Sequence, residues 1–237
     1  MKISLVIPAH NEALYVSRCL SSILKYRHEC LHEIIVVDNA SLDNTAEVAT
    51  GFSGVRVVHE EKKGLTRARQ KGFEAASGDI IAYVDSDTEL SPDWFETVVR
   101  EFSADAGLVC LSGPYRYYDL SFFKNFLVRF YWYCIAFPTY LLTGFMAVGG
   151  NFAARRSAIE QIGGFDTSIA FYGEDTDIAR RLHKVGKVKF KLSFFILTSP
   201  RRFSGQGFFK TGLIYGLNFF SEAILHRPVT KKYEDIR

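Results

Sequence analysis

The sequence predicts an α/β fold, with a Rossmann-like, mainly parallel sheet flanked by helices. Through roughly the first hundred residues, short apolar runs alternate with stretches whose apolar residues recur at helical spacing, a pattern typical of β–α–β units. Two carboxylates, Asp85 and Asp87, directly follow one such run at residues 80–84. Because open α/β sheets bind ligands beyond the carboxyl ends of their strands, the same pattern predicts the edge at which a site lies.

The elements of this first half follow in strict alternation. Short, mainly apolar runs predict strands over residues 3–7, 34–37, 55–58 and 80–84, and the last, which follows a turn and is wholly apolar, is expected to be buried. Helices are expected over residues 12–24, 41–50, 66–76 and 94–102. The last should begin with Ser91 as its N-cap and Pro92 in its first turn. Right-handed crossovers would then bring the segments after Pro8, Val37 and Val84 together at one edge of the sheet.

The second half is rich in aromatic residues and less regular. Residues 130–148 contain no charged side chain, and 19 helical residues would span about 28 Å at about 1.5 Å per residue, enough to cross a bilayer. Pro138, Gly144 and the strand-like segment 147–154 favour core or interfacial packing instead. A further helix is expected over residues 207–225, lying on a bilayer or packed on the core.

Composition narrows the function classes. The 237 residues, 48% of them hydrophobic, suffice for one large core. A net charge of +3, from 29 basic and 26 acidic residues, gives no global reason to expect a nucleic-acid partner. The cysteines lack zinc-ligand spacing, so reduced thiols are expected. The apolar N-terminal run is too short for a signal peptide, which predicts a location in the cytosol or on the cytosolic face of a membrane.

Two acidic pairs are candidates for chemistry. Asp85 and Asp87 could hold Mg²⁺ or Mn²⁺ that bridges to a diphosphate, or they could lie in a solvated turn. Glu174 and Asp175 precede a helical pattern at residues 178–182. There they could form a capping cluster favoured by the helix dipole, or supply a base that accepts a proton from an acceptor hydroxyl.

Five motifs in order carry a resemblance that covers about three quarters of the chain. They are Ser-Leu-Val-Ile-Pro-Ala-His-Asn-Glu at residues 4–12, Val-Val-Asp-Asn-Ala-Ser at 36–41, Gly-Leu-Thr-Arg-Ala-Arg at 64–69, Asp-Ser-Asp at 85–87 and Gly-Glu-Asp at 173–175. Together they resemble the inverting glycosyltransferases of family 2. The resemblance implies the GT-A fold, a nucleotide-diphosphate sugar donor, with a UDP-sugar preferred, and a divalent cation, Mn²⁺ or Mg²⁺.

The resemblance also implies where the nucleoside would lie. Pro8, His10 and Glu12 match the first loop, which borders the nucleoside. Asp38 matches the acid that contacts the base or the ribose.

The other implied donor contacts come from later motifs. Gly64 and Arg69 lie in the segment that lines the nucleotide, and Asp85 should face the ribose. Asp87 matches the aspartate that binds the metal between the two phosphates.

The catalytic group implied by the resemblance is Asp175, which matches the base, with Glu174 beside it. Residues 149–151 match a small-residue strand beneath the donor sugar, with a tight turn as the alternative. The Gln-x-x-Arg-Trp segment of processive synthases is missing after Asp175, which disfavours polymerisation. No histidine occurs in residues 190–205 as a third metal ligand. Arg201 and Arg202 could meet the diphosphate or form a solvated turn.

These inferences lead to one assignment with two alternatives. Residues 1–110 are expected to be the nucleotide-sugar-binding half and residues 111–200 the acceptor-binding and catalytic half of one domain. Residues 201–237 would form a helical tail with possible peripheral membrane contact. The predicted reaction moves one sugar to a glycan or glycolipid hydroxyl, such as a lipid-linked precursor. The alternatives are a sugar nucleotidyltransferase, which should show a Gly-rich basic signature after its first strand, and a non-catalytic membrane-associated protein.

Overall fold

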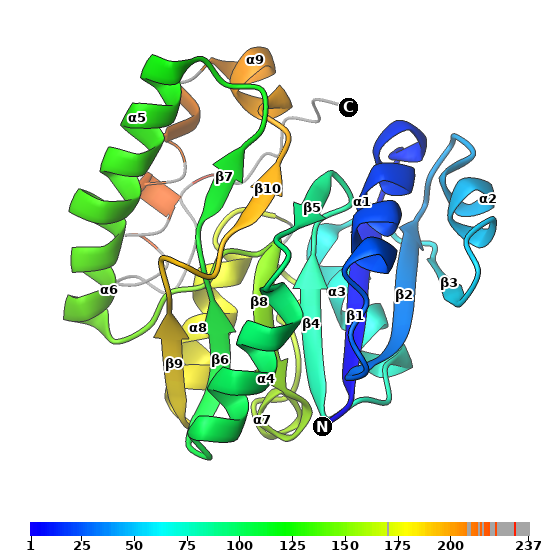
Figure 1. Ribbon diagram of the computed structural model, residues 1–237, viewed down its shortest axis with the longest axis horizontal. Helices are drawn as coiled ribbons and strands as arrows, with labels where there is room; N and C mark the ends of the chain where they lie inside the picture. Colours follow the sequence, from blue (N-terminus) through cyan, green and yellow to red (C-terminus); the bar gives the residue numbers. More distant parts are fainter. Residues whose placement is uncertain are drawn as a thin grey trace.

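The structure, a computed structural model, describes residues 1–169 and 171–207, together with 210–212, 214, 216–218, 221 and 230. Its main layer is a seven-stranded sheet with helices on both faces (Figure 1). The strands follow the order β3 (Val55–Glu60), β2 (Leu31–Asn39), β1 (Ile3–Ala9), β4 (Ile80–Val84), β8 (Asn151–Arg155), β6 (Leu108–Ser112) and β9 (Lys187–Phe190). This arrangement confirms the predicted α/β class.

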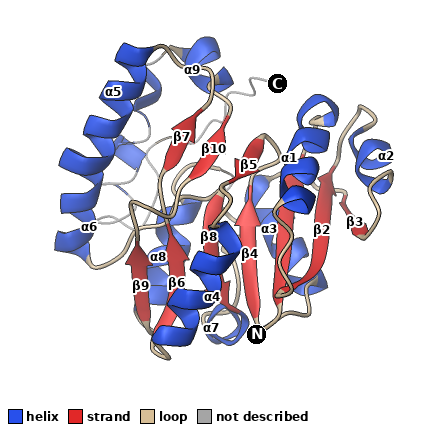
Figure 2. Ribbon diagram, in the orientation of Figure 1, coloured by secondary structure: helices blue, strands red, loops and turns tan. Residues whose placement is uncertain are grey.

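A smaller sheet lies beyond one end of the large one (Figure 2). Its three strands are β5 (Thr88–Leu90), β10 (Ile196–Thr198) and β7 (Tyr115–Tyr117), in that order. β5 begins only four residues after β4 ends, so the segment with Asp85 and Asp87 links the two sheets. The corner between the sheets is therefore next to the predicted site.

The large sheet is mainly parallel, as predicted, with one exception. β1 pairs in parallel with β2 and β4, β2 pairs in parallel with β3, and β6 pairs in parallel with β9. β8 runs antiparallel to both of its neighbours, β4 and β6. The predicted strand over residues 147–154 begins only at Asn151, because the Asn151 N–H donates to the Val148 carbonyl at 2.8 Å and closes a turn. For Gly149 and Gly150 the turn interpretation was the correct one.

Side chains that alternate along the strands divide the core between the two faces. Leu5 and Ile7 of β1 belong to the cluster with α1 (Ala13–Lys25) and α4 (Trp94–Ala104), whereas Val6 belongs to the cluster on the opposite face. That face is covered by α3 (Leu65–Ala75), α7 (Arg156–Gln161) and α8 (Glu174–His183). Strands buried on both faces read as continuous apolar runs, which explains why the sequence located them.

Two helix starts differ from the prediction. The helix expected over residues 41–50 is α2 (Thr45–Thr50). It begins late because Asp43 accepts hydrogen bonds from the Ala13 N–H and the Thr45 N–H, which hold the preceding residues in a turn. Ser91 is not an N-cap: α4 starts at Trp94, whose N–H bonds to the Ser91 carbonyl at 3.1 Å, and Pro92 lies before the helix.

Residues 122–143 form a continuous rod, here called the outer helix, on the flank of the molecule beside β9 and β7 (Figure 1). It comprises α5 (Phe122–Tyr131), the π-helical turn η1 (Trp132–Ala136) and α6 (Phe137–Thr143). Gly144 ends it in the left-handed conformation at φ 79°. Of the helices that the structure describes, none is long and apolar enough to cross a membrane. α9 (Arg201–Gln206) follows β10, whereas most of the helix expected over residues 207–225 lies outside the described residues.

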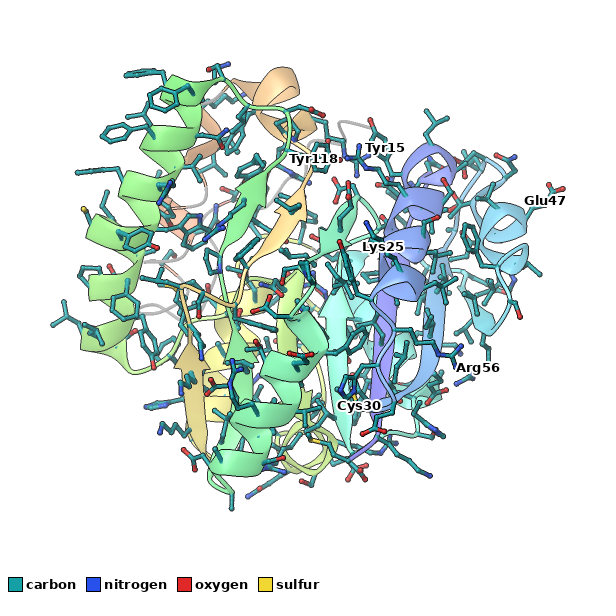
Figure 3. The ribbon with its side chains drawn as sticks, viewed as in Figure 1. Tyr15, Lys25, Cys30, Glu47, Arg56 and Tyr118 are labelled. Atoms are coloured by element: carbon teal, nitrogen blue, oxygen red, sulfur yellow. The ribbon has the colours of Figure 1, made fainter. Side chains whose placement is uncertain are left out.

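Glu33, a partly buried carboxylate, is expected to make the stability of the fold sensitive to acid. Glu33 accepts hydrogen bonds from Ser4 Oγ and Ser77 Oγ at 2.7 Å and from Arg56 Nη2 at 2.6 Å, and Figure 3 shows Arg56 at the outer edge of the sheet. Although partial burial opposes its charge, these donors lower the pKa of Glu33 from 4.5 to about 2. The resulting stability is present above pH 4.5 and is lost as pH falls from there towards 2.

We therefore expect Glu33→Gln to lower the melting temperature at pH 7 and to flatten its decline between pH 4.5 and 2. Thermal unfolding followed by circular dichroism across this range measures both effects. Glu61→Gln, at an exposed position, is the matched control and should follow the wild-type curve. Equal acid-induced losses in Glu33→Gln and wild type would contradict the assignment.

Candidate active site

A pocket of about 550 Å³ opens where the two sheets and the outer helix meet. Seven predicted site residues line it, namely Pro8, Glu12, Arg69, Asp85, Asp87, Glu174 and Asp175. They come from the ends of β1 and β4, from α3 and from the start of α8. The ends of β1 and β4 therefore meet in this pocket as predicted, and the later Gly-Glu-Asp motif joins them from the other half of the chain.

At the base of the pocket lies Arg69, only 1% exposed. Its Nη1 pairs with Glu174 Oε1 and its Nη2 lies 3.3 Å from Asp85 Oδ1. Burial opposes the guanidinium charge, but these two carboxylates outweigh it and raise the pKa of Arg69. A buried charge is tolerated when it is paired in this way. Arg69 therefore connects Asp85 with Glu174, which are 89 positions apart in the sequence.

Tyr115, which the sequence analysis did not single out, completes the contacts of Asp85. Its hydroxyl donates to Asp85 Oδ2 at 2.7 Å and accepts from the Gly150 N–H at 2.9 Å. A Cβ at Gly150 would overlap Asp85 Oδ2 and the Tyr115 hydroxyl, and one at Gly149 would lie 2.6 Å from Arg69 Nη2. The two glycines are needed because charged side chains pack directly against this turn.

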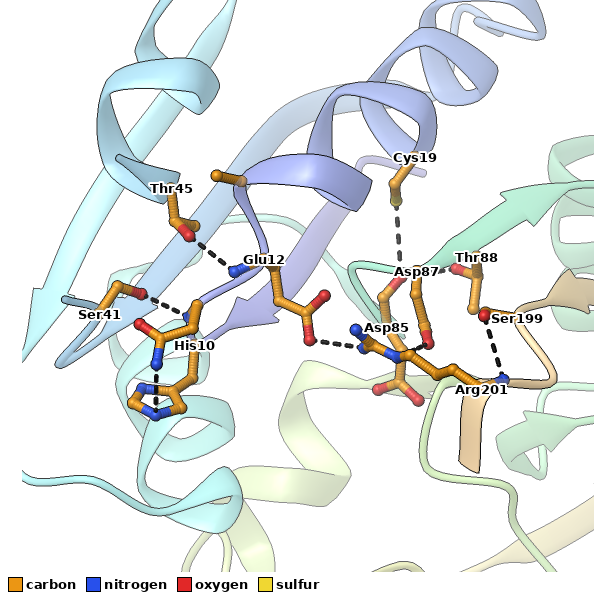
Figure 4. A network of polar contacts seen from close by, with 12 residues as sticks. His10, Glu12, Cys19, Ser41, Thr45, Asp85, Asp87, Thr88, Ser199 and Arg201 are labelled. Carbon is orange, nitrogen blue, oxygen red and sulfur yellow. Dashed lines mark hydrogen bonds and ion pairs between the residues drawn. The ribbon is translucent and has the colours of Figure 1, made fainter. Parts of the chain in front are cut away.

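A second arginine, Arg201, pairs with two other carboxylates of the pocket, Glu12 and Asp87 (Figure 4). Arg201 Nη2 donates to Glu12 Oε1 at 2.6 Å, and its Nε lies 3.0 Å from Asp87 Oδ2. The guanidinium also lies over the ring of Tyr15, 4.5 Å from the ring centroid. Burial opposes its charge, but Asp87 and Glu12 raise the pKa of Arg201. The solvated-turn interpretation of Arg201 is therefore wrong.

The donors around Asp87 fit a divalent cation only together with a substrate. Across the described part of the chain, no group of three or more His, Cys, Asp or Glu side chains gathers as a ready-made metal cage. Mg²⁺ is typically held by one or two carboxylates plus phosphate oxygens and water, and Asp87 provides one such carboxylate at the pocket wall. A cation there would have to share Asp87 with Arg201 or displace it.

Asp175 lies in the first turn of α8, whose N-cap residue is Gly173 at φ 84°. Its Oδ1 accepts from the Thr176 N–H at 2.8 Å and its Oδ2 from the Gly149 N–H at 3.3 Å. Burial raises the pKa of Asp175 above 3.8, and burial raises that of Glu174 to about 7 despite the adjacent Arg69. The N-cap residue Gly173 has no side chain to cap the helix, whereas Asp175 bonds an N–H of the first turn, so Asp175 also contributes to capping.

One carboxylate oxygen of Glu174 is unpaired among the residues that the structure describes. While Oε1 pairs with Arg69, Oε2 is buried and has no hydrogen-bond partner among the residues that the structure describes. An unsatisfied buried carboxylate oxygen costs free energy. Such an atom on the pocket wall is suited to accept a hydrogen bond from a polar ligand.

The three other predicted residues gather at the end of β2, beside the pocket rather than in its wall. His10 Nδ1 lies 2.7 Å from the Asn39 carbonyl, and the Gly64 N–H donates to Asn39 Oδ1 at 2.7 Å. Asp38 Oδ2 contacts His59 Nδ1 at 3.1 Å. The β2–β3 register places Asp38 directly opposite His59, a residue that the sequence analysis did not single out.

Comparison with known proteins decides the family. A model described as "Glycosyl transferase family 2" matches residues 4–163. The chain belongs to glycosyltransferase family 2. The resemblance carried by the five motifs is thereby confirmed.

Related sequences bear glycosyltransferase names. This family 2 chain is 29% identical over 231 residues to "Glycosyltransferase GlyG" of Streptococcus pneumoniae, covering 95% of this chain and 64% of that protein. It is 30% identical over 207 residues to "Probable glycosyltransferase YdaM" of Bacillus subtilis, covering 78% of this chain and 47% of that one. The chain thus spans less than two thirds of the length of these relatives.

Solved structures confirm that this family 2 chain has the GT-A fold. The mannosyltransferase PcManGT of Pyrobaculum calidifontis, in complex with GDP-Man and Mn²⁺, superposes with a TM-score of 0.73 at 18% identity. The superposition covers 95% of this chain and 63% of that one. Glucosyl-3-phosphoglycerate synthase of Mycobacterium tuberculosis, with Mn²⁺, UDP and phosphoglyceric acid, gives 0.65 at 20% identity, covering 94% and 78%.

The sequence analysis of this family 2 member missed Tyr115, which lines the pocket, and His59, which lies beside it, and it left Arg201 open. Tyr115 and His59 gave no signal, because His59 lies opposite Asp38 only through strand pairing and Tyr115 reaches Asp85 only where the two sheets meet. Arg201 had a weak signal, a basic pair directly after a turn proline. Only the fold identifies Arg201 as a residue of the site, because it lies at the start of α9, just beyond a strand of the small sheet.

Proposed function

We propose that this chain transfers a single sugar, with inversion, from a nucleotide-diphosphate sugar to an acceptor hydroxyl on a glycan or glycolipid. A UDP-sugar is the first donor to test, and Mn²⁺ or Mg²⁺ the proposed cation. One observation carries the proposal: a single pocket is lined by both Asp87 and Asp175. The carboxylate that we propose for the phosphate side and the one that we propose as the base thus line one cavity, although they come from distant parts of the chain.

Asp175 is the proposed base. Its buried carboxylate has a raised pKa, and a base works best when its pKa lies near the operating pH. Asp175 would accept the proton of the acceptor hydroxyl as that oxygen bonds to the anomeric carbon. The bond from this carbon to the diphosphate oxygen breaks on the opposite face, and the electron pair leaves with the nucleoside diphosphate.

Glu174, assigned with Asp175 to the catalytic pair, is better suited to orientation. A pKa of about 7 would also suit a base, but Glu174 Oε1 is held by Arg69 at the base of the pocket. Its buried Oε2, without a partner among the described residues, could accept a hydrogen bond from a hydroxyl of the donor or acceptor. We assign proton transfer to Asp175 and substrate positioning to Glu174.

The leaving diphosphate would lie between Asp87 and Arg201. A divalent cation held by Asp87 would supply Lewis-acid stabilisation of the departing charge, often worth several kcal/mol. Arg201 is a second cation within 3.0 Å of Asp87. Its guanidinium suits phosphate geometry, so it is proposed to move onto the diphosphate when donor and cation bind.

The nucleoside is assigned to the neighbouring edge at β2. There Asp38 is buried, and its Oδ1 has no hydrogen-bond partner within the described part of the chain. A ribose hydroxyl or a base N–H would satisfy this oxygen. Pro8 and Glu12 line the pocket between this edge and Asp87, while His10 and Gly64 are proposed to shape the loop around Asn39.

A thermal-shift screen tests the proposal. The purified protein is heated with UDP, GDP, dTDP, CDP and their common sugars, each with and without Mn²⁺. We expect one nucleotide to raise the melting temperature strongly and only with the metal, since a ligand at 100 times its Kd stabilises by about 2.7 kcal/mol. Release of the nucleoside diphosphate on adding acceptors then measures transfer. No shift with any donor would support the non-catalytic alternative, and pyrophosphate-dependent turnover would support the nucleotidyltransferase.

A further inference from the structure

The outer helix has a face that no other part of the described structure covers. Its large exposed apolar side chains are Phe122, Phe123, Phe126, Phe130, Tyr131, Tyr133, Ile135, Leu141 and Leu142. Several recur every three or four positions, which gathers them on one side of a helix. The exposed fractions reach 90% at Phe122 and 88% at Leu142. Figure 3 shows side chains extending from this helix away from the two sheets.

The charged side chains of the outer helix all have one sign. Between residues 120 and 150 the sequence contains Lys124 and Arg129 but no Asp or Glu, and both basic side chains are exposed. Arg116, also exposed, lies beside the same face, with its guanidinium 3.5 Å from the centroid of the Phe195 ring. Exposed aromatic and aliphatic side chains combined with cations are typical of helices that lie on anionic membranes.

The opposite side of the same helix belongs to the pocket. Leu127, Val128, Tyr131 and Trp132 line it, and the Trp132 ring stacks on Phe190 with the ring centroids 5.7 Å apart. Burial and then the nearby charge of Asp175 raise the pKa of Tyr131. Tyr131 therefore lies where the exposed face meets the pocket, lining the pocket while part of its side chain is exposed.

We propose that the outer helix lies flat on an anionic lipid surface and presents the pocket to an acceptor anchored in that surface. The proposal rests on the proposed function and names its acceptor class, an amphiphile whose hydroxyl-bearing head enters beside Tyr131. At about 1.5 Å per residue, residues 122–143 would give a contact roughly 33 Å long. The side chains of Lys124 and Arg129 would contact lipid phosphates, and the exposed aromatic rings of the outer helix would enter the headgroup region.

Vesicle flotation tests the surface. Wild-type protein should float with vesicles of phosphatidylcholine and phosphatidylglycerol and much less with phosphatidylcholine alone. The double variant Phe123→Glu/Phe130→Glu, at positions outside the pocket wall, should bind anionic vesicles at least tenfold more weakly. The matched control is Leu42→Glu. Leu42 is also highly exposed, at 93%, but it precedes α2 and is not part of the outer helix. Lys124→Ala/Arg129→Ala should remove the preference for anionic lipid.

Cys134 supplies a second readout, because it is exposed on the outer helix while Cys19, Cys30 and Cys110 are buried. A polarity-sensitive dye on Cys134 should shift to the blue with anionic vesicles. Absence of flotation and of a dye shift would overturn the proposal, as would equal binding by the double variant. A dimer in solution that the double variant breaks, without vesicle binding, would assign the face to a second copy.

Failure of this inference can be separated from failure of the proposed function. The double variant should retain the nucleotide-dependent thermal shift and the transfer to a short water-soluble acceptor, while it loses transfer to an acceptor embedded in vesicles. If the wild-type protein binds no donor, the proposed function is rejected, but the flotation result still tests membrane binding independently. Equal transfer by the variant to both acceptors would reject only the membrane role.

Discussion

Replacing Asp175 by asparagine is expected to lower turnover by roughly 10²- to 10⁴-fold, the range associated with loss of a general base. The donor should still bind, because Asp175 contacts the Gly149 turn and its own helix rather than Asp87 or Arg201. Release of the nucleoside diphosphate measures turnover, and the thermal shift with donor and Mn²⁺ measures binding. Retention of wild-type turnover would assign the base elsewhere.

The pH profile distinguishes a base from a structural acid. Burial raises the pKa of Asp175 above 3.8, so its proton-accepting form is lost as pH falls through that raised value. The acidic limb of kcat in the wild type should therefore lie above the ordinary aspartate range and be absent from the residual activity of Asp175→Asn. Glu174→Gln separates the two neighbours: it should impair substrate affinity and stability, because it weakens the pair with Arg69, while the acidic limb persists.

Asp87→Asn is expected to abolish the metal-dependent part of donor binding and to lower turnover by roughly 10³-fold, as loss of several kcal/mol of charge stabilisation would require. Paramagnetic resonance of Mn²⁺ titrated with and without nucleotide gives a readout that does not depend on activity. Asp93→Asn is the control, since Asp93 is exposed and makes no side-chain capping bond to α4. Unchanged Mn²⁺ affinity in Asp87→Asn would move the cation away from this residue.

Arg201→Ala tests whether the effect of Asp87→Asn comes from the metal or from the broken ion pair. Arg201 occupies one oxygen of Asp87, so its removal should leave Mn²⁺ affinity equal or higher, even if turnover falls through a lost diphosphate contact. If Arg201→Ala and Asp87→Asn reduce Mn²⁺ affinity alike, the ion pair itself organises the site.

Much of the fold could be predicted because it is locally determined. β4 and the central parts of β1 and β2 are buried on both faces, so they appear as short apolar runs whatever their partners. The amphipathic spacing of α1 likewise follows from the one face that it buries. The position of Asp85 and Asp87 followed directly, since a residue after a strand must lie at the end of that strand.

What the sequence by itself determined, then, is the α/β class, the order of the elements in its first half and the sheet edge where carboxylates gather. Tertiary structure alone decided that β8 inserts antiparallel between β4 and β6, and that Arg69 and Arg201 each pair with two carboxylates from different segments. Such pairings leave no periodic pattern, because a buried ion pair depends on where two distant backbones meet. Tyr115 could not be predicted from the sequence for the same reason, since its hydroxyl reaches Asp85 only because the two sheets meet at that corner.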